Sequence, residues 1–417
     1  MKDDKKVPQL RFPEFTDAWK QRKFGDSFDF LQNNTLSRAS LNDTSGCAKN
    51  VHYGDILVKF GESISAEKAD LPFICEREIL KKLSKSILKN GDVVIADTAE
   101  DMTTGKSCEI VDVDECMPVL AGLHTIPVRP KQKFGKYYLG YYLNSEAFHS
   151  QLIPLIQGIK VYSISKSSIK DTVVMFPDDV QEQEKIGSLF NRIDNTITLQ
   201  QRKLNSLQKL KKGLLQKMFP KKGENIPEIR FPEFSDAWKQ RKFGDFAKVS
   251  MCKRIFKEET TQTGDVPFFK IGTFGGIPDA FISRYKFESY KAKYPYPKKG
   301  DILISASGSI GRIVEYSGKD EYFQDSNIIW LDHDESVLNS FLKHVYSIIK
   351  WNGIEGTTIK RLYNDNVLTT KILTPSLEEQ SKIGAFFTQL DNTITLQQRK
   401  LESLQKLKKG LLQQMFI

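Results

Sequence analysis

Two stretches of the chain carry the apolar pattern of long amphipathic helices. Between Glu182 and Phe219 there is no proline, and hydrophobic residues recur at intervals of three, four and seven positions. Such spacing places them along one stripe of a helix and is typical of a coiled coil or a helix pair. The stripe residues are Ile193, Ile197, Leu204, Leu207, Leu214 and Met218 in the first stretch, and Leu390, Ile394, Leu401, Leu404, Leu411 and Met415 in the second. A helix of roughly 38 residues would be ~57 Å long, which is too long for the interior of one compact domain. Each helix has one apolar face that needs a partner, and the other helix matches it in length. We expect the two to pair antiparallel, with the modules at opposite ends.

Polar residues mark the start and the middle of both helices. Asp179 stands three residues before Glu182, and Ser376 three before Glu379, which is the spacing of a capping box. Gln200 and Gln397 interrupt the stripes, either as polar layers that set the register of the pair or as glutamines facing solvent. Between 200 and 222 there are eight Lys or Arg and no acid, which form either a solvated helix face or a surface for phosphate.

The regions that precede the helices have the pattern of mixed α/β domains. Residues 27–175 and 246–372 alternate short apolar runs with turn signals. A glycine opens the runs that begin at Asp55, Asp92 and Asp301, so we predict a strand after each. Helices are predicted over 134–150 and 336–351. The two regions are most alike where LKNGDVVIADTAED matches PKKGDILISASGSI, and where QGIKVYSISKSSIKDTVVMFP matches EGTTIKRLYNDNVLTTKILTP.

The chain repeats its own frame. The segment VPQLRFPEFTDAWKQRKFGD, from Val7, returns 219 positions later with four conservative changes, and we call both copies the box. The segment DNTITLQQRKLNSLQKLKKGLLQKMF, from Asp194, returns 197 positions later with two changes. Such a period is far too long for a solenoid, so a whole module is duplicated.

This organisation predicts an α+β fold with pseudo-two-fold internal duplication, in which two mixed α/β domains are separated by two long antiparallel coiled-coil helices. The predicted parts are 1–177 (first box and first variable domain), 178–220 (central helix), 221–375 (second box and second variable domain) and 376–417 (second helix).

Composition indicates which kind of binding partner and which cellular compartment to expect. The chain has a net charge of +10, which fits a polyanion such as nucleic acid. No apolar run is long enough to span a bilayer, and the start MKDDKKVPQL lacks the apolar stretch of a signal peptide. The five cysteines include no C-x-x-C pair, so we expect reduced thiols and a cytoplasmic protein without membrane contact.

Candidate DNA contacts lie in loops at matched positions of the two variable regions. Arg and Lys suit phosphate and guanine, and hydroxyl or amide side chains suit base edges. For each loop taken alone an ordinary surface turn is the competing interpretation, but the recurrence favours DNA. The candidates are Thr98, Lys160, Tyr162 and Ser163 in the first region, and Lys270, Ser305, Ser307, Gly308, Arg312, Lys360, Arg361 and Tyr363 in the second.

Catalytic motifs are not found. Gly105-Lys106-Ser107 lacks the first glycine of a phosphate-binding loop, because Glu100 stands there. The five histidines show no metal-binding spacing, so we predict no catalytic residues, no metal site and no cofactor bound by this chain.

The boxes and the helices together carry a family resemblance. RFPEF(T/S)DAWKQRKFGD at Arg11 and Arg230, DNTITLQQRKL at Asp194 and Asp391, and LKKGLLQ(K/Q)MF at Leu210 and Leu407 frame two variable modules. Over its whole length the chain resembles the specificity subunit of bacterial type I restriction-modification systems.

The resemblance implies a division of labour. The variable modules would be target recognition domains, each contacting one half of a split, asymmetric double-stranded DNA site. The helices would set the spacing and dock two methyltransferase subunits, which restriction motor-nuclease subunits join. S-adenosylmethionine, ATP and Mg²⁺ would be used by those other subunits, in adenine methylation and phage defence.

Two other functions compete with this one. The chain could be a coiled-coil scaffold without sequence-specific DNA binding, or an enzyme whose centre has no recognisable motif. DNA binding by the purified chain separates the first from the recognition role, and turnover by the chain alone separates the second.

Overall fold

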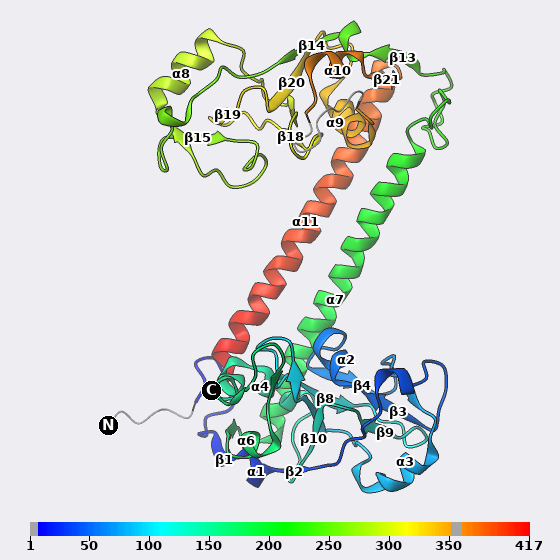
Figure 1. Cartoon of the computed structure of the whole chain (residues 1–417), viewed down its shortest axis with the longest axis vertical. Helices are drawn as coiled ribbons and strands as arrows, with labels where there is room; N and C mark the ends of the chain where they lie inside the picture. The colour runs from blue at the N-terminus through cyan, green and yellow to red at the C-terminus, as the bar shows by residue number, and fades with distance from the viewer. Residues whose placement is uncertain (1–6, 352–360) are drawn as a thin grey trace. The chain divides into compact units, whose positions relative to one another are not determined.

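The computed structural model describes residues 7–351 and 361–417, which form two compact units. Of the described residues, unit 1 comprises 7–201 and 399–417, and unit 2 comprises 202–351 and 361–398. The helix α7 (Val180–Lys217) begins in unit 1 and ends in unit 2, and α11 (Leu377–Met415) begins in unit 2 and ends in unit 1. Figure 1 colours the chain from blue at the N-terminus to red at the C-terminus and labels many of its elements. Each unit therefore contains one box, one variable region and parts of both long helices.

The box forms the same small structure in both units. β1 (Lys20–Lys23) pairs antiparallel with β12 (Val173–Phe176), and β13 (Lys239–Lys242) pairs antiparallel with β21 (Lys371–Thr374). The box tryptophan is buried against a phenylalanine from the end of a long helix, Trp19 against Phe416 and Trp238 against Phe219, with ring centroids 6.4 and 5.7 Å apart. The amphipathic helix ends and the boxes thus bury each other's apolar faces.

A central sheet forms the body of each unit. In unit 1 the order is β2-β10-β6-β8-β4, and in unit 2 it is β14-β20-β17-β18. The bounds are β2 (Phe28–Phe30), β4 (Ser63–Ser65), β6 (Val93–Ala96), β8 (Ser107–Val111) and β10 (Thr125–Pro130) in unit 1, and β14 (Ala247–Ser250), β17 (Ile302–Ser305), β18 (Ile313–Glu315) and β20 (Ile328–His333) in unit 2. Within the described residues, β4, which is parallel to β8, is the one strand of this sheet without an equivalent in the sheet of unit 2.

Both faces of each sheet are covered. Along β6, Val93 and Ile95 belong to a core that includes Trp19 and Phe416, whereas Val94 belongs to a second core on the other face. The same alternation occurs along β17. Because both faces are buried, these strands are continuous apolar runs rather than alternating ones.

A second, smaller sheet lies under the other face of each central sheet. β3 (Ala48–Val51) pairs antiparallel with β5 (Phe73–Ile74) and parallel with β9 (Val119–Ala121). In unit 2, β15 (Val266–Phe269) pairs with β16 (Phe281–Ile282) and β19 (Tyr322–Phe323) in the same two senses. The two variable regions, which share little sequence, therefore share one topology.

The remaining elements are short. In unit 1 they are α1 (Phe24–Ser27), α2 (Tyr53–Val58), α3 (Arg77–Lys82), β7 (Thr98–Ala99), α4 (Tyr138–Asn144), α5 (Glu146–His149), β11 (Tyr162–Ser163) and α6 (Lys166–Lys170). In unit 2 they are α8 (Arg284–Lys293), α9 (Asn339–Ile348) and α10 (Asn364–Thr369). Single 3₁₀ turns occupy Arg38–Ser40, Ser84–Ser86, Ile153–Leu155, Phe243–Asp245 and Lys257–Glu259.

The two long helices run antiparallel, as predicted. In unit 1 Asp194 of α7 forms an ion pair with Lys408 of α11 at 2.8 Å, and Phe190 packs on Phe416 further along. In unit 2 the duplicated residues make the same contacts, with Lys211 pairing with Asp391 at 2.5 Å. Figure 1 shows the end of α11, in red, beside α4 of unit 1. One repeated sequence thus supplies both partners of the pair.

Burial along the long helices follows the predicted stripes. Every stripe residue from Ile193 to Met218 and from Leu390 to Met415 is buried or half-buried. The side-chain oxygens of Gln200 and Gln397 are buried, so these glutamines do not simply face solvent, and their role in register stays a prediction. Within the basic run Lys211 pairs with Asp391, and Lys217 and Lys221 pair with Glu228, so part of its charge is neutralised.

Two local predictions were wrong or inexact, and three were confirmed. The run after Asp55 is helix α2 rather than a strand, because His52 caps its first turn through Gly54 and a short apolar run fits either element. The predicted helix over 134–150 is divided into α4 and α5 at Ser145, whose backbone is extended. The strands after Asp92 and Asp301 are confirmed as β6 and β17, and the helix predicted over 336–351 is confirmed as the shorter α9.

The two predicted capping boxes use their acids differently. Asp179 accepts a hydrogen bond from the N–H of Gln181, and the hydroxyl of Ser376 accepts one from the N–H of Glu379. Glu182 instead receives two hydrogen bonds from the guanidinium of Arg11, and Glu379 receives two from Arg230. The acids that the local pattern assigns to the helix caps are therefore bonded to arginines of the boxes, which are distant in sequence.

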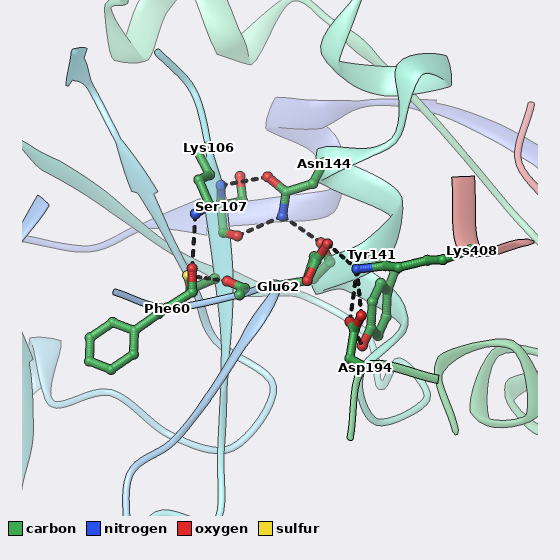
Figure 2. Close-up of polar contacts among 11 residues, drawn as sticks. Phe60, Glu62, Lys106, Ser107, Tyr141, Asn144, Asp194 and Lys408 are labelled. Atoms are coloured by element: carbon green, nitrogen blue, oxygen red, sulfur yellow. Dashed lines mark hydrogen bonds and ion pairs between the residues drawn. The ribbon is translucent and has the colours of Figure 1, made fainter. Parts of the chain in front are cut away.

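Unit 1 has one polar junction that unit 2 makes only in part. Figure 2 shows the ammonium group of Lys408 between two carboxylates, Glu62 at 2.8 Å and Asp194 at 2.8 Å. Tyr141 donates its hydroxyl to Asp194 at 2.6 Å. Glu62 directly precedes β4, which has no counterpart among the described strands of the central sheet in unit 2. The added strand therefore brings an additional anchor between the variable region and α11.

Replacing Lys408 by methionine is expected to destabilise unit 1 by about 2 kcal/mol, because two partly buried carboxylates lose a charged hydrogen-bond donor. The matched Lys211→Met variant should cost unit 2 about half as much, because Lys211 serves one carboxylate. Hydrogen exchange of the full-length chain, with peptides from each unit followed separately, measures both. Equal losses would contradict the added role of Glu62.

Candidate nucleic-acid interface

In unit 1, three segments that are far apart in sequence meet just beyond β6. β7 pairs antiparallel with β11, so that Ser163 stands opposite Thr98. The N–H of Asp97 donates to the carbonyl of His124 at 3.1 Å, and the carbonyl of Asp97 accepts the N–H of Ile164 at 2.9 Å. Oγ1 of Thr98 lies 3.4 Å from Nδ1 of His124. Backbone hydrogen bonds thus bring the side chains of Thr98, His124 and Ser163 together, and we call them the unit 1 triplet.

Unit 2 has the same arrangement with different side chains. Ser307 forms an antiparallel bridge with Arg361, and the N–H of Leu362 donates to the carbonyl of Ala306 at 2.8 Å. The N–H of Ala306 donates to the carbonyl of Asn327 at 2.7 Å. The hydroxyl of Ser307 donates to Oδ1 of Asn327 at 2.7 Å. We call Ser307, Asn327 and Arg361 the unit 2 triplet.

The structure brings most of the predicted candidates into these two places. Lys160, Ser163, Gly308, Arg312, Arg361 and Tyr363 are exposed; Thr98, Tyr162 and Lys270 are half-buried; Ser305 and Ser307 are buried. Lys360 lies outside the described residues. Four of the six triplet residues were predicted from the matched loops, and direct contact with DNA stays a prediction for all of them.

Three of the candidate side chains form hydrogen bonds or an ion pair within the protein. The buried hydroxyl of Ser305 donates to the carbonyl of Ser309 and accepts from the N–H of Arg312, so its role is to shape the turn. The guanidinium of Arg312 donates to the carbonyl of Phe274 at 2.7 Å. Lys270 forms an ion pair with Asp279 at 2.8 Å. These contacts occupy hydrogen-bonding groups of the three side chains that a ligand would otherwise use.

Sequence reasoning missed His124 and Asn327. Each stands directly before a strand of the central sheet, β10 or β20, and neither belongs to a loop with matching sequence in the other region. The available signal was a single polar residue in front of a buried strand, which is too common to single out a site. Pairing between β6 and β10, and between β17 and β20, is what carries these residues to the triplets.

The surroundings of the unit 1 triplet are acidic and partly apolar. The carboxylate of Asp97 lies 3.4 Å from Nδ1 of His124, and Glu100 and Asp101 follow on the exposed turn. A hydrogen bond from Thr103 lowers the pKa of Asp101. On the opposing loop Ile159 is 91% exposed. Carboxylates repel phosphate, so this place suits the edges of bases better than the DNA backbone.

Neither a metal-binding cluster nor a membrane-spanning helix occurs in the part of the chain that the structure describes. No group of three or more His, Cys, Asp and Glu side chains within 7–351 and 361–417 is arranged to hold a metal ion. In the same part of the chain, no helix combines the length and the apolar character that crossing a membrane requires.

Comparison with known proteins identifies the family. The family model of the type I restriction modification DNA specificity domain matches residues 16–209 and 235–406, and so covers both variable regions and most of both long helices. The chain belongs to the type I specificity subunits. Members of this family are the non-catalytic subunits that recognise DNA sequence in type I restriction-modification systems.

Relatives and solved structures agree with this assignment. A putative type I restriction enzyme specificity subunit of Haemophilus influenzae, S.HindORF215P, is 41% identical over 66% of this chain and 70% of its own. The putative MjaX specificity subunit of Methanocaldococcus jannaschii is 24% identical over 96% of this chain and 93% of its own.

Two solved structures share the fold. The S subunit of a type I system from M. genitalium matches with a TM-score of 0.62 at 16% identity, covering 99% of both chains. A chain from a structure on complex assembly and conformational transition of the type I system matches with a TM-score of 0.51 at 16% identity, covering 94% of this specificity subunit and 96% of that chain.

Proposed function

We propose that this specificity subunit recognises a split, asymmetric site in double-stranded DNA, with each unit contacting one half. The observation that carries the proposal is the pair of triplets. Equivalent backbone positions present Thr98, His124 and Ser163 in unit 1 but Ser307, Asn327 and Arg361 in unit 2. Two identical recognition surfaces would favour a palindromic site, whereas surfaces with different hydrogen-bonding groups favour two unlike half-sites.

The repeated frame supports a symmetric pair of protein partners. Box and helix are nearly identical in the two units, while the variable regions differ. A surface that occurs twice suits two copies of one partner, and the methyltransferase subunit of the system is the partner we propose, joined by restriction motor-nuclease subunits. In this arrangement the other subunits use S-adenosylmethionine, ATP and Mg²⁺, and the complex works on DNA in the cytoplasm.

The net charge of +10 supports the sequence-independent part of DNA affinity. A coiled-coil scaffold that does not bind DNA is disfavoured, because the family match covers both variable regions and not the helices alone.

The experiment is a map of methylated adenine in the host genome, with the gene intact, deleted, and restored on a plasmid. We expect one split motif to lose methylation on deletion and to regain it on restoration. Purified chain with its methyltransferase partner should select the same motif from random DNA. If the assembled complex binds all sequences alike, the proposed function is wrong.

A further inference from the structure

We propose that His124 and Ser163 in unit 1, and Asn327 and Arg361 in unit 2, are equivalent base-reading residues, and that the hydroxyls of Thr98 and Ser307 position them. The inference rests on the proposed function and specifies where each unit obtains its sequence preference. It extends the loop candidates by two residues, His124 and Asn327, that no sequence motif indicated.

The equivalence is set by backbone contacts that recur between the units. Each central strand, β6 or β17, continues into a residue whose N–H donates to the residue before β10 or β20, at 3.1 Å in unit 1 and 2.7 Å in unit 2. The carbonyl of the same residue, Asp97 or Ala306, accepts an N–H from the third segment at 2.9 or 2.8 Å. Because the backbone carries the geometry, the side chains are free to differ without loss of the fold.

The positioning residue keeps its chemistry while the readers change. Thr98 and Ser307 both offer a hydroxyl that contacts the side chain before β10 or β20, at 3.4 Å for His124 and 2.7 Å for Asn327. The Thr98 hydroxyl donates to Oδ1 of Asp97 at 2.8 Å, so toward Nδ1 of His124 it acts as an acceptor. Ser307 is buried, as a positioning residue would be. The residue across from the hydroxyl is Ser163 in one unit and Arg361 in the other, both exposed.

The reader side chains have the groups that distinguish bases. The imidazole of His124 is 47% exposed and offers a donor or an acceptor at each ring nitrogen. Asn327 accepts from Ser307 through Oδ1, and its Nδ2 group is a donor that suits a base edge. Arginine makes two hydrogen bonds to guanine. We therefore expect a guanine in the half-site of unit 2, contacted by Arg361.

Backbone conformation marks the same place. His124 has φ 54° and Ser326, directly before Asn327, has φ 53°. Non-glycine residues adopt this left-handed region rarely and at a cost in free energy, and such residues cluster at functional sites. Unit 1 also places the ring of Tyr53 edge-on to His124, with centroids 5.2 Å apart, which limits how the imidazole can turn.

The test uses the full chain assembled with its methyltransferase partner and selection of bound sequences from a random DNA library. His124→Ala should relax preference at one base pair of the unit 1 half-site by roughly 5- to 150-fold and leave the other half unchanged. Arg361→Ala should do the same for the guanine in the unit 2 half. Ser163→Ala and Asn327→Ala complete the set. Tyr285→Ala and Val58→Ala, which remove exposed side chains outside the triplets and their loops, serve as matched controls.

The outcomes separate the inference from the proposed function. If the wild-type complex selects a split motif and the four triplet variants keep it unchanged, the inference is overturned and the proposed function stands. Relaxation of both halves by one variant would also overturn it. If the wild type selects no motif, both fall. Should His124→Ala not fold, His124→Asn, which installs the side chain that unit 2 carries at this position, must change the preferred base in the unit 1 half alone.

Discussion

The Arg11→Met variant is expected to lose about 3–5 kcal/mol of the stability of unit 1. Arg11 donates from Nε to Oε1 of Glu182 at 2.6 Å and from Nη2 to Oε2 at 2.8 Å. The Glu182 side chain is only 1% exposed. Removing the guanidinium leaves a carboxylate buried without a counter-charge, and that burial, rather than the lost attraction, causes the cost.

The duplication supplies the matched control. Arg230 makes the same two bonds to Glu379 in unit 2, with 11% and 1% of the side chains exposed. Arg230→Met should therefore weaken unit 2 to the same extent and leave unit 1 unaffected. Hydrogen exchange of the full-length chain is the suitable measurement, because a chain with two units need not unfold in one step.

A double variant tests the physical reason. Replacing Glu182 by leucine in the Arg11→Met background removes the uncompensated charge, so most of the lost stability should return. If the double variant is no more stable than Arg11→Met alone, the loss comes from packing of the arginine stem and not from the buried charge.

Acidification is expected to destabilise unit 2 through His344 by about 3 kcal/mol between pH 6.5 and 4. The imidazole is buried on α9 with its ring centroid 4.8 Å from that of Phe387. Burial lowers its pKa from 6.5 to about 4; Asp391 acts in the opposite sense, and Lys211 and Lys343 lower it further. The folded unit therefore resists taking up the proton that the unfolded chain accepts.

The direction follows from the number of protons bound. Between pH 4 and 6.5 the unfolded chain holds a proton on His344 that the folded unit lacks, so stability rises with pH across this range. The contribution is fully present above the unfolded pKa and is lost as the pH falls through the folded one. His344→Phe should remove this slope, and the difference between variant and wild type at each pH isolates it from the titration of carboxylates.

Unit 1 provides the internal reference, because Tyr141 occupies the position of His344. Its ring centroid lies 5.2 Å from that of Phe190, the residue that corresponds to Phe387. Burial raises the pKa of the Tyr141 hydroxyl, so the group stays neutral throughout this range. Exchange in unit 1 should consequently lack the His344 contribution. An equal acid response in the two units, retained in His344→Phe, would contradict the assignment.

Much of the architecture could be predicted from periodicity and repetition, because both are local properties of the chain. The stripe from Ile193 to Met218 predicts a long helix through its spacing alone, and the second stripe does the same. Each stripe needs an apolar surface of matching length to bury it, so two nearly identical stripes of equal length indicate that the two helices pair with each other. The strands after Gly91 and Gly300 were found because a turn glycine precedes an apolar run, and both glycines have positive φ.

The short element after Gly54 shows where local pattern fails. A run of four apolar and acidic residues fits a strand or a helical turn equally well, and the side chain of His52 decides for the helix by capping it. Glu182 and Glu379 fit a local capping role, yet arginines from the boxes, 171 and 149 residues away, take both carboxylates. Neither outcome is contained in a window of a few residues.

The sequence by itself determined the duplicated frame, the antiparallel helix pair and four of the six triplet residues, because these depend on spacing and repetition. Only the tertiary structure decided that His124 and Asn327 complete the triplets, that Ser305 is buried, and that Glu62 reaches Lys408. These facts arise from pairing between strands distant in sequence. Hydrogen bonds between such strands set which side chains converge, and no short segment of the chain encodes that register.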